Sequence, residues 1–400
     1  MSQGLGAPPP PVGPSAGWAL MFGNFAIGCG VMVVGGSLND LTRSLNVSVA
    51  IAGQLITVAA VMMCLGAPVL AAALSGWCRR RLLSLALGWY ALGHALCALM
   101  PDYATLMPLR ALTVLSAAVF TPQAGAAMGW LAPPEQRGRA ITFVFLGWSV
   151  ASVVGMPLHA YIGETWGWRY AFGLVAVLAA LGAGWVWHAL PEGVRPPRMD
   201  RQAWGEVFAH PRLMWVVAVT ALAGAGQFTL FAYFSPYLRQ GLNAQASEIS
   251  VVFACFGTLG LMGNLWLSQR VDALGAARAV GWLLALQCLS MALWPLASSV
   301  AGLLLLIAPW ALSGFACASA QQARLASAAP ALAPALLAMN TSAIYLGQAL
   351  GAAGGGLMMT ANAAAGRNSF VGLSVLALAW TGLALWLSHT VRQAGLRAKV

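Results

Sequence analysis

The chain has 400 residues, of which 60% are hydrophobic and only 7% are charged, and its mean hydropathy is +0.78. Soluble globular domains carry about 25% charged residues, so this composition excludes a soluble domain and indicates a protein that crosses the membrane many times. The net charge of +11 does not indicate a nucleic-acid binder, because the basic residues are scattered in short loops between apolar runs and not gathered on one soluble face.

Twelve apolar runs long enough to span a bilayer, which needs about 20 residues, follow one another along the chain. They cover approximately residues 17–38, 50–74, 82–100, 104–130, 140–163, 168–190, 213–238, 248–268, 279–297, 300–326, 334–361 and 367–389. The uncharged start of the chain lacks the basic segment of a cleaved signal peptide, so the first run is expected to be retained. A Pro-rich, charged segment separates the sixth run from the seventh. The predicted organisation is a disordered tail 1–16, a six-helix bundle 17–190, a cytoplasmic linker 191–212, a second six-helix bundle 213–389 and a tail 390–400.

The distribution of arginine and lysine predicts the orientation. With both termini inside, fourteen basic residues fall in cytoplasmic segments and four fall in outside loops. The positive-inside rule therefore places both termini in the cytoplasm, in a bacterial inner membrane. The two remaining basic residues, Arg110 and Arg324, lie within apolar runs.

The fifth run carries a stripe of small residues. Gly147, Ala151 and Gly155 recur every four positions, which on a helix leaves one face without side-chain bulk and lets another backbone approach closely. Pro157 follows and lacks a backbone donor, so this helix is expected to bend.

A second stripe lies 200 positions further along the chain, at Gly347, Gly351 and Gly355. Two stripes at this separation in a chain of 400 residues suggest two related halves. Repeated six-span halves are typical of secondary transporters.

Several sequence segments together resemble the major facilitator superfamily, in its twelve-span drug:proton antiporter branch with the arabinose-efflux-like permeases. These segments are SLNDLTRSLNVSVAIAGQLIT, GAPVLAAALSGWCRRRLL, PLRALTVLSAAVFTPQAGAAM, PPEQRGRA, GWSVASVVGMPLHAYIGETWGWRYAF, QQARLASAAP and AMNTSAIYLGQALGAAGGGLM. The resemblance implies an all-α fold of twelve transmembrane helices in two pseudo-symmetric bundles. It also implies that the Gly and Pro pattern of the fifth span packs where the two halves meet and is associated with export.

The same resemblance implies a gate at the cytoplasmic side. Its residues in this chain are Arg79, Arg80 and Arg81 after the second span, with Asp272 as the acid of the second-half counterpart. The acid that usually precedes the basic run is replaced here by Cys78.

Four residues are candidates for proton coupling. The resemblance implies this role for Arg110, and we expect Asp40 at a comparable depth to be its partner. The alternatives are an Arg110 that extends to the outer interface and an Asp40 that caps a helix or turn. His94 and His159 are the other possible proton carriers, because histidine titrates near neutral pH, although either could be a packing residue.

Polar side chains within the apolar runs are candidates for a substrate cavity, since amides facing lipid would be penalised. The alternative is hydrogen bonding between helices without substrate contact. The candidates are Asn24, Gln54, Gln123, Gln227, Tyr233, Asn264, Gln321, Gln322, Asn340, Tyr345 and Gln348.

No nucleotide-binding, metal-ligating or catalytic motif is found, so neither an enzyme nor a cofactor is expected. The predicted function is proton-coupled efflux of a small organic solute, either a drug or a sugar-like compound, by a monomer in the lipid bilayer. A metabolite facilitator or proton symporter is one alternative, and a non-transporting membrane sensor or scaffold is another.

Overall fold

The computed structural model describes residues 14–47, 49–195, 201–234, 237–366, 368, 370 and 372–397, and no strand occurs in these ranges. Long helices are the expected product of this sequence, because a helix satisfies the backbone hydrogen bonds of an apolar segment internally. The first half comprises α1 (Pro14–Gly36), α2 (Leu38–Ser44), α3 (Val49–Ala73), α4 (Arg79–Leu99), α5 (Tyr103–Leu131), α6 (Arg137–Val150), α7 (Met156–Thr165) and α8 (Trp168–Ala189). The second half comprises α10 (Pro211–Phe231), α12 (Ala246–Leu274), α13 (Ala276–Leu293), α14 (Val300–Ala328), α15 (Ala333–Ala364) and α16 (Leu373–Arg397), and α9 (Arg201–Ala209) precedes it.

The twelve-span prediction is confirmed. Eleven helical segments of the described chain are long and apolar enough to cross a membrane, with α6 and α7 forming one of them. The remaining predicted span, 334–361, is present as α15 and is less apolar because it carries five glycines and several amides. Several boundaries differ from the prediction by six or more residues: α10 ends at Phe231, α12 continues to Leu274, and α16 begins at Leu373 and continues to Arg397, into the segment predicted as a tail.

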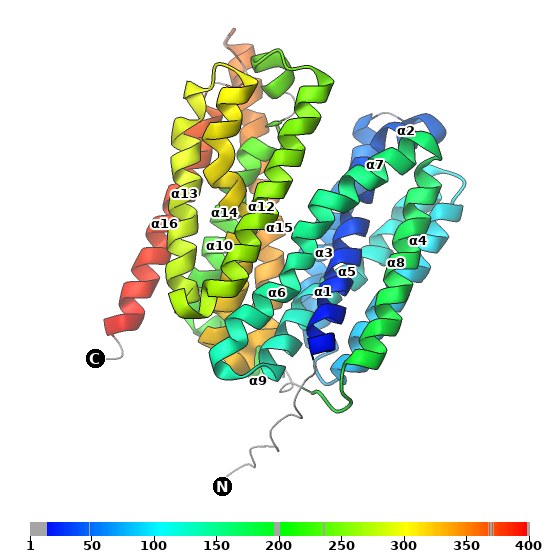
Figure 1. The fold of residues 1–400 in the computed structure, drawn as a ribbon, viewed down its shortest axis with the longest axis vertical. Coiled ribbons are helices and arrows are strands. Elements are labelled where there is room, and N and C mark those ends of the chain that lie inside the picture. The colour runs from blue at the N-terminus through cyan, green and yellow to red at the C-terminus, as the bar shows by residue number, and fades with distance from the viewer. Residues whose placement is uncertain are drawn as a thin grey trace.

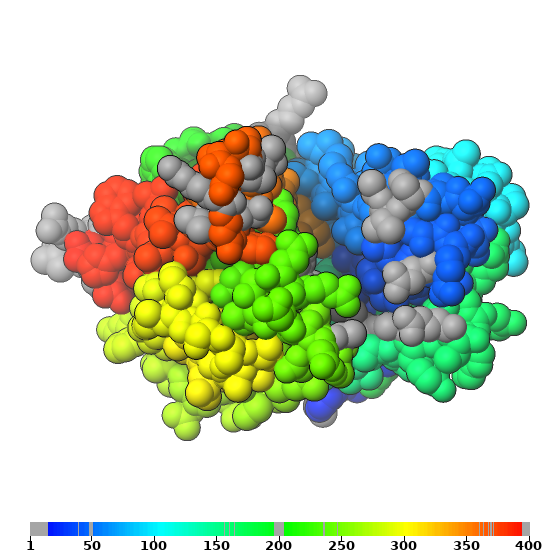
Figure 2. Space-filling view, turned by 90° about the horizontal axis from the view of Figure 1, so that it is seen from above, coloured from blue at the N-terminus to red at the C-terminus, as the bar shows by residue number. Residues whose placement is uncertain are grey.

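The two halves of the chain lie side by side (Figure 1). The halves come together toward the end of the molecule that carries α9, called here the α9 end, and diverge toward the end that carries α2, called the α2 end. Figure 2, seen from the α2 end, shows the first half of the sequence on one side and the second half on the other. Within the predicted linker, residues 196–200 are outside the described residues, as are 1–13 of the first tail and 398–400 of the last.

The first glycine stripe packs against α1. A Cβ added to Gly147 would lie 2.3 Å from the carbonyl oxygen of Met21, and one added to Gly155 would lie 2.6 Å from Sγ of Cys29. Ala151 is fully buried on the same side, facing Gly28. The small residues therefore let two helices of the same half touch and do not themselves face the other half, as was expected of them, although the helix that carries them does lie where the halves meet.

The second stripe repeats this arrangement in the second half. Added Cβ atoms at Gly347 and Gly351 would lie 2.3 and 2.2 Å from the carbonyl oxygens of Ala221 and Ala225 on α10. Gly355 faces the same segment, since its added Cβ would lie 3.0 Å from the carbonyl oxygen of Thr229 on α10 and 2.7 Å from the ring of Tyr233, just after α10. Small residues specify a close approach but not the identity of the partner helix, which explains the error.

Other faces of the same two helices do contact the opposite half. Nδ2 of Asn264 on α12 donates to Oγ of Ser149 on α6 at 2.8 Å. Ser342 on α15 and Cys64 on α3 exchange side-chain to carbonyl hydrogen bonds. Each stripe helix thus joins its own first helix to the other half.

The predicted irregularity at Pro157 is a π-helical turn over Ala151–Gly155, which separates α6 from α7. Proline cannot donate to the carbonyl four residues earlier, and its ring crowds that carbonyl. A π turn is a common way to absorb such a break within a helix.

Candidate functional site

A buried arginine lies at the centre of the first half. Arg110 on α5 is fully buried. Its Nη2 donates to the carbonyl oxygen of Gly30 on α1 at 2.7 Å, and its Nη1 lies 3.0 Å from Nε2 of His94 on α4. A guanidinium group has donors only, so Nε2 of His94 must be the acceptor.

The bond to Arg110 fixes the protonation state of His94. Because Nε2 accepts, the ring proton is on Nδ1, which is 2.9 Å from the carbonyl oxygen of Tyr90 and donates to it. A protonated His94 would have no lone pair for Arg110 and would place a second positive charge beside it. The Arg110–His94 hydrogen bond is therefore possible only while the imidazole is neutral.

Aromatic side chains enclose this pair. The Arg110 guanidinium lies 5.8 Å from the ring centre of Phe172, and the His94 ring lies 4.2 Å from that of Tyr90. The Tyr90 hydroxyl donates to the carbonyl oxygen of Ile27 at 3.0 Å. Tyr90 and Gly30 were not among the predicted site residues, although the four-residue spacing of Tyr90 and His94 places both on one face of α4 and was the available signal.

The predicted partner of Arg110 is elsewhere. Oδ2 of Asp40 accepts the backbone N–H of Trp168 at 2.7 Å, at the start of α8. The Asp40–Arg110 pairing is therefore wrong for this structure, and Asp40 acts as a cap, although of α8 and not of the helix that follows it. Arg80 and Glu192 form an ion pair at 3.1 Å, but Arg110 forms none with the residues that the structure describes.

His159 is the second buried imidazole. It lies on α7, is fully buried, and neither ring nitrogen has a hydrogen-bond partner among the described residues. Buried polar groups are usually paired, so His159 is a position where a proton or a water could be accepted.

Several of the amide candidates connect helices. In the first half, Asn24 on α1 accepts from Thr121 at 2.9 Å and donates to the carbonyl oxygen of Val144 at 3.1 Å. In the second half, Thr220 on α10 donates to Asn340 at 2.6 Å and accepts from Gln321 at 3.1 Å. The helices joined are α1, α5 and α6 in one half and α10, α14 and α15 in the other.

Four further candidates also have partners. The Tyr103 hydroxyl donates to the carbonyl oxygen of Ile51 at 2.8 Å and also lies 3.4 Å from Oε1 of Gln54, and Trp310 donates to Gln227 at 3.4 Å. Tyr233 donates to the carbonyl oxygen of Ala352 at 2.6 Å, and Asn264 donates to Ser149, as described above. These contacts favour the helix-bonding alternative over substrate contact.

The other candidates keep polar atoms available. The side-chain carbonyl oxygens of Gln123 and Gln322 are buried and have no partner among the described residues. Tyr345 is buried in the hydrophobic cluster that contains Tyr90, so it reaches from α15 into the first half. Gln348 on α15 is half-buried. Solute contact stays a prediction for these four side chains.

Asp272 connects the halves at the α9 end. Its two carboxylate oxygens accept the backbone N–H groups of Gly138 and Arg139, each at 2.8 Å, at the start of α6. A carboxylate at a helix N-terminus is favourable because it meets unpaired donors and the positive end of the helix dipole. A side chain at position 138 would collide with this carboxylate, since an added Cβ would lie 2.3 Å from Oδ1.

The three arginines of the predicted gate stay within the first half. Nη1 of Arg79 donates to the carbonyl oxygen of Trp77 at 3.0 Å, and Arg80 pairs with Glu192. Arg81 is exposed. Of the predicted gate residues, Asp272 is the one with hydrogen bonds to the other half.

We expect Asp272→Asn to weaken the contact between the two halves at the α9 end. An amide keeps one acceptor but loses the charge, and such a charge at a helix N-terminus contributes about 0.3–2 kcal/mol. Hydrogen exchange at the amides of residues 137–142 should become faster. Asp102→Asn is the matched control, because Asp102 accepts the N–H of Thr105 at 2.9 Å within one half, and this bond lowers the pKa of Asp102. Equal exchange at residues 137–142 in wild type and Asp272→Asn would contradict the expectation.

Comparison with known proteins gives consistent results. The profile of the Major Facilitator Superfamily matches residues 20–241. The inner membrane transport protein YdhP of Escherichia coli O157:H7 is 31% identical over 346 residues, which are 86% of this chain and 88% of the relative. A chloramphenicol efflux pump of Mycobacterium tuberculosis strain H37Rv is 30% identical over 241 residues, which are 59% of this chain and 58% of the relative.

Solved structures agree in fold. The human organic anion transporter MFSD10 has a TM-score of 0.74 at 15% identity, covering 94% of this chain and 99% of that one. The proton:xylose symporter XylE has a TM-score of 0.70 at 17% identity, covering 94% and 95% of the two chains.

Proposed function

The chain belongs to the Major Facilitator Superfamily and is a secondary transporter, and from this premise we propose that it exports a small organic solute in exchange for protons. The proposal places it as a monomer in a bacterial inner membrane, and the name of its relative, the inner membrane transport protein YdhP, supports the location. The observation that carries the proposal is the buried Arg110–His94 hydrogen bond, which protonation of His94 must break.

The proton would act by releasing Arg110. With His94 neutral, the guanidinium is held between His94 and the carbonyl oxygen of Gly30. Protonation replaces an attraction by a repulsion between two cations, in a site to which the described residues bring no carboxylate, so Arg110 must change partners. The state with Arg110 held and the state with Arg110 released then differ in proton affinity, which is the requirement for coupling.

The distribution of positive charge supports an orientation in which the α9 end lies on the cytoplasmic side of the membrane. In that orientation, the hydrogen bonds of Asp272 close the cytoplasmic side, and the divergence of the halves faces the outside (Figure 1). Transport would proceed by rocking of the two halves, as in other transporters built from repeats.

The substrate class is an uncharged or weakly charged organic compound. Eight of the nine acidic residues belong to the described part of the chain, where they lie in short helices, near the ends of long helices or in connecting segments, so that part offers no carboxylate in the middle of a span for a polycation. Relatives named chloramphenicol efflux pumps point to aromatic drugs. Sugar-like compounds are the second class.

The test is uptake of labelled chloramphenicol and arabinose, separately, into proteoliposomes with an acidic lumen. Protons leave the lumen down their gradient, so an antiporter accumulates its solute inside, whichever way the protein is inserted. A symporter would instead deplete the lumen of solute, and a sensor or scaffold would show neither accumulation nor counterflow. Either of the latter results with both solutes would contradict proton-coupled export of these two classes.

We expect Asp40→Asn to keep proton-driven accumulation, because Asp40 caps α8 and does not touch Arg110. Loss of the cap should lower the free energy of unfolding by about 1 kcal/mol. Thermal unfolding and the uptake assay on the same preparation measure both effects. A variant with unchanged stability and abolished proton drive would instead assign the proton to Asp40.

A further inference from the structure

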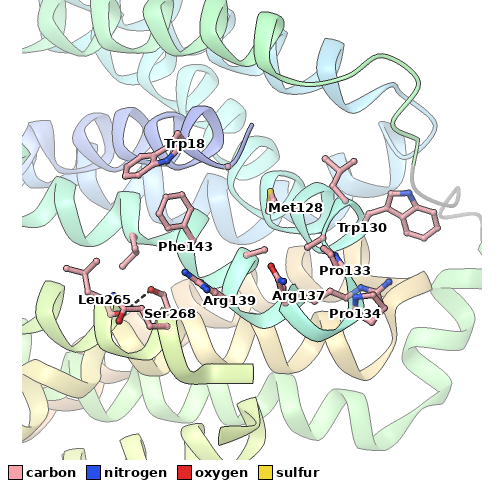
Figure 3. A pocket seen from close by; sticks show the side chains of 17 residues that line it. Trp18, Met128, Trp130, Pro133, Pro134, Arg137, Arg139, Phe143, Leu265 and Ser268 are labelled. Carbon is pink, nitrogen blue, oxygen red and sulfur yellow. Dashed lines mark hydrogen bonds between the residues drawn. The ribbon is translucent and has the colours of Figure 1, made fainter. Parts of the chain in front are cut away.

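A cavity of about 790 Å³ lies between the halves at the α9 end (Figure 3). The first half contributes the start of α1, the end of α5 and the start of α6. The second half contributes Leu265, Ser268 and Gln269 of α12. An occupant of this cavity would therefore touch both halves.

One wall of the cavity is apolar and reaches the membrane-facing surface. Trp18 and Phe143 form an edge-to-face pair with ring centres 4.9 Å apart, and Leu265 faces them from the other half (Figure 3). Trp18 is 50% exposed and Leu265 is 40% exposed, although both belong to membrane spans. Trp18 and Trp130 lie at the α9 ends of their helices, where tryptophan marks the boundary between lipid tails and headgroups.

Another part of the cavity lining is positively charged. Arg137 and Arg139 line the cavity, and its lining contains no acidic side chain. The nearby Asp272 already accepts two backbone N–H groups, and neither arginine forms an ion pair with the described residues. Nε of Arg137 is buried without a hydrogen-bond partner in that part of the chain.

We propose that this cavity binds an anionic phospholipid from the leaflet at the α9 end. The phosphate lies against Arg137 and Arg139, whose planar donor groups suit phosphate oxygens. One acyl chain follows the apolar wall of Trp18, Phe143 and Leu265 into the bilayer. Because both halves line the cavity, the bound lipid stabilises the conformation in which the α9 ends are together.

The cavity fits a lipid better than a free anion. Inorganic phosphate would occupy a small part of 790 Å³ and would leave the aromatic wall in contact with water. A lipid covers both the charged and the apolar walls, and it arrives from the side on which Trp18 and Leu265 are exposed.

Native mass spectrometry of the purified full-length protein tests the proposal, with dioleoyl-phosphatidylglycerol and dioleoyl-phosphatidylcholine as probes. We expect one phosphatidylglycerol to bind at least about tenfold more tightly than phosphatidylcholine, which corresponds to about 1.4 kcal/mol. Arg137→Gln/Arg139→Gln should abolish this preference. The control Arg212→Gln/Arg278→Gln removes two exposed charges from other sites near the α9 end and should retain it.

A second variant keeps the test informative if the double variant misfolds. Gln269→Glu adds a negative charge to the lining at an exposed position without changing the side-chain shape. It should weaken phosphatidylglycerol binding and leave phosphatidylcholine binding unchanged. The proposal would be overturned if the control double variant lost the preference for phosphatidylglycerol to the same extent, or if the wild type bound the two lipids equally. It would also be overturned if inorganic phosphate at equimolar concentration displaced the lipid fully. These readouts require no transport, so they can fail independently of the proposed export function.

Discussion

Gly351→Ala is expected to cause a large loss of stability. The added methyl group would lie 2.2 Å from the carbonyl oxygen of Ala225 and 2.9 Å from the backbone nitrogen of Thr229. Both atoms belong to the backbone of α10, so relief requires a shift of the whole helix. Overpacking of this kind costs about 1–3 kcal/mol, and thermal unfolding of the purified protein should show a clear decrease in Tm. Gly147→Ala should have a similar effect in the first half, because its new methyl group would lie 2.3 Å from the carbonyl oxygen of Met21.

Gly281→Ala and Gly184→Ala are the matched controls for the two halves. No atom lies within 4 Å of a Cβ added at either position. Alanine favours a helix over glycine by about 1 kcal/mol, so these variants should unfold at the same or a higher temperature. Equal behaviour of the stripe and control variants would show that the close helix contacts described here are absent from the protein.

Arg110→Met is expected to abolish proton drive while the protein still folds. The substitution removes a buried charge that has no carboxylate partner among the described residues, but it leaves the carbonyl oxygen of Gly30 and Nε2 of His94 without their donor, and a buried polar group left unsatisfied costs about 1–3 kcal/mol. The acceleration of chloramphenicol uptake by an acidic lumen should fall by more than about tenfold, the equivalent of 1.4 kcal/mol in the coupled step, with a moderate decrease in Tm.

Arg324→Met provides the comparison in the second half. Arg324 on α14 is also buried, but its Nη1 donates to Oγ of Ser388 at 2.9 Å and to Oε1 of Gln321 at 3.3 Å, with no histidine partner. The Arg324→Met variant should retain the acceleration of chloramphenicol uptake by an acidic lumen. If Arg110→Met keeps full acceleration, or if both variants lose it equally, Arg110 has no specific part in coupling.

The sequence predicts the helices well because each span requires a long apolar run, and the predicted runs lie on the observed helices. Charged gate residues were also identifiable, but the N–H groups that bind Asp272 belong to the backbone of α6, which no residue pattern reveals. The same limit applies to the glycine stripes, since a face without side chains is compatible with any helix that can reach it.

The candidate proton site was predicted only in part. An arginine in an apolar run is unusual enough to identify Arg110, but its partner depends on how α1, α4 and α5 pack around it. Asp40 was chosen as the nearby carboxylate, whereas the structure places Asp40 at the start of α8 and His94 next to Arg110. The amides show the same limit: Asn24 and Asn340 carry no signal that separates a helix bond from a solute contact, and their partners Thr121 and Thr220 appear only once the helices are packed.

The most direct test of the central claim compares wild type with His94→Gln in one measurement of labelled chloramphenicol exchange in proteoliposomes, with and without an acidic lumen. Glutamine keeps a side-chain acceptor for Arg110 but cannot be protonated near neutral pH. We predict equal counterflow of the two proteins without a gradient, and accumulation in an acidic lumen by wild type alone. Equal proton-driven accumulation by His94→Gln would contradict the assignment of the coupling proton to the Arg110–His94 pair.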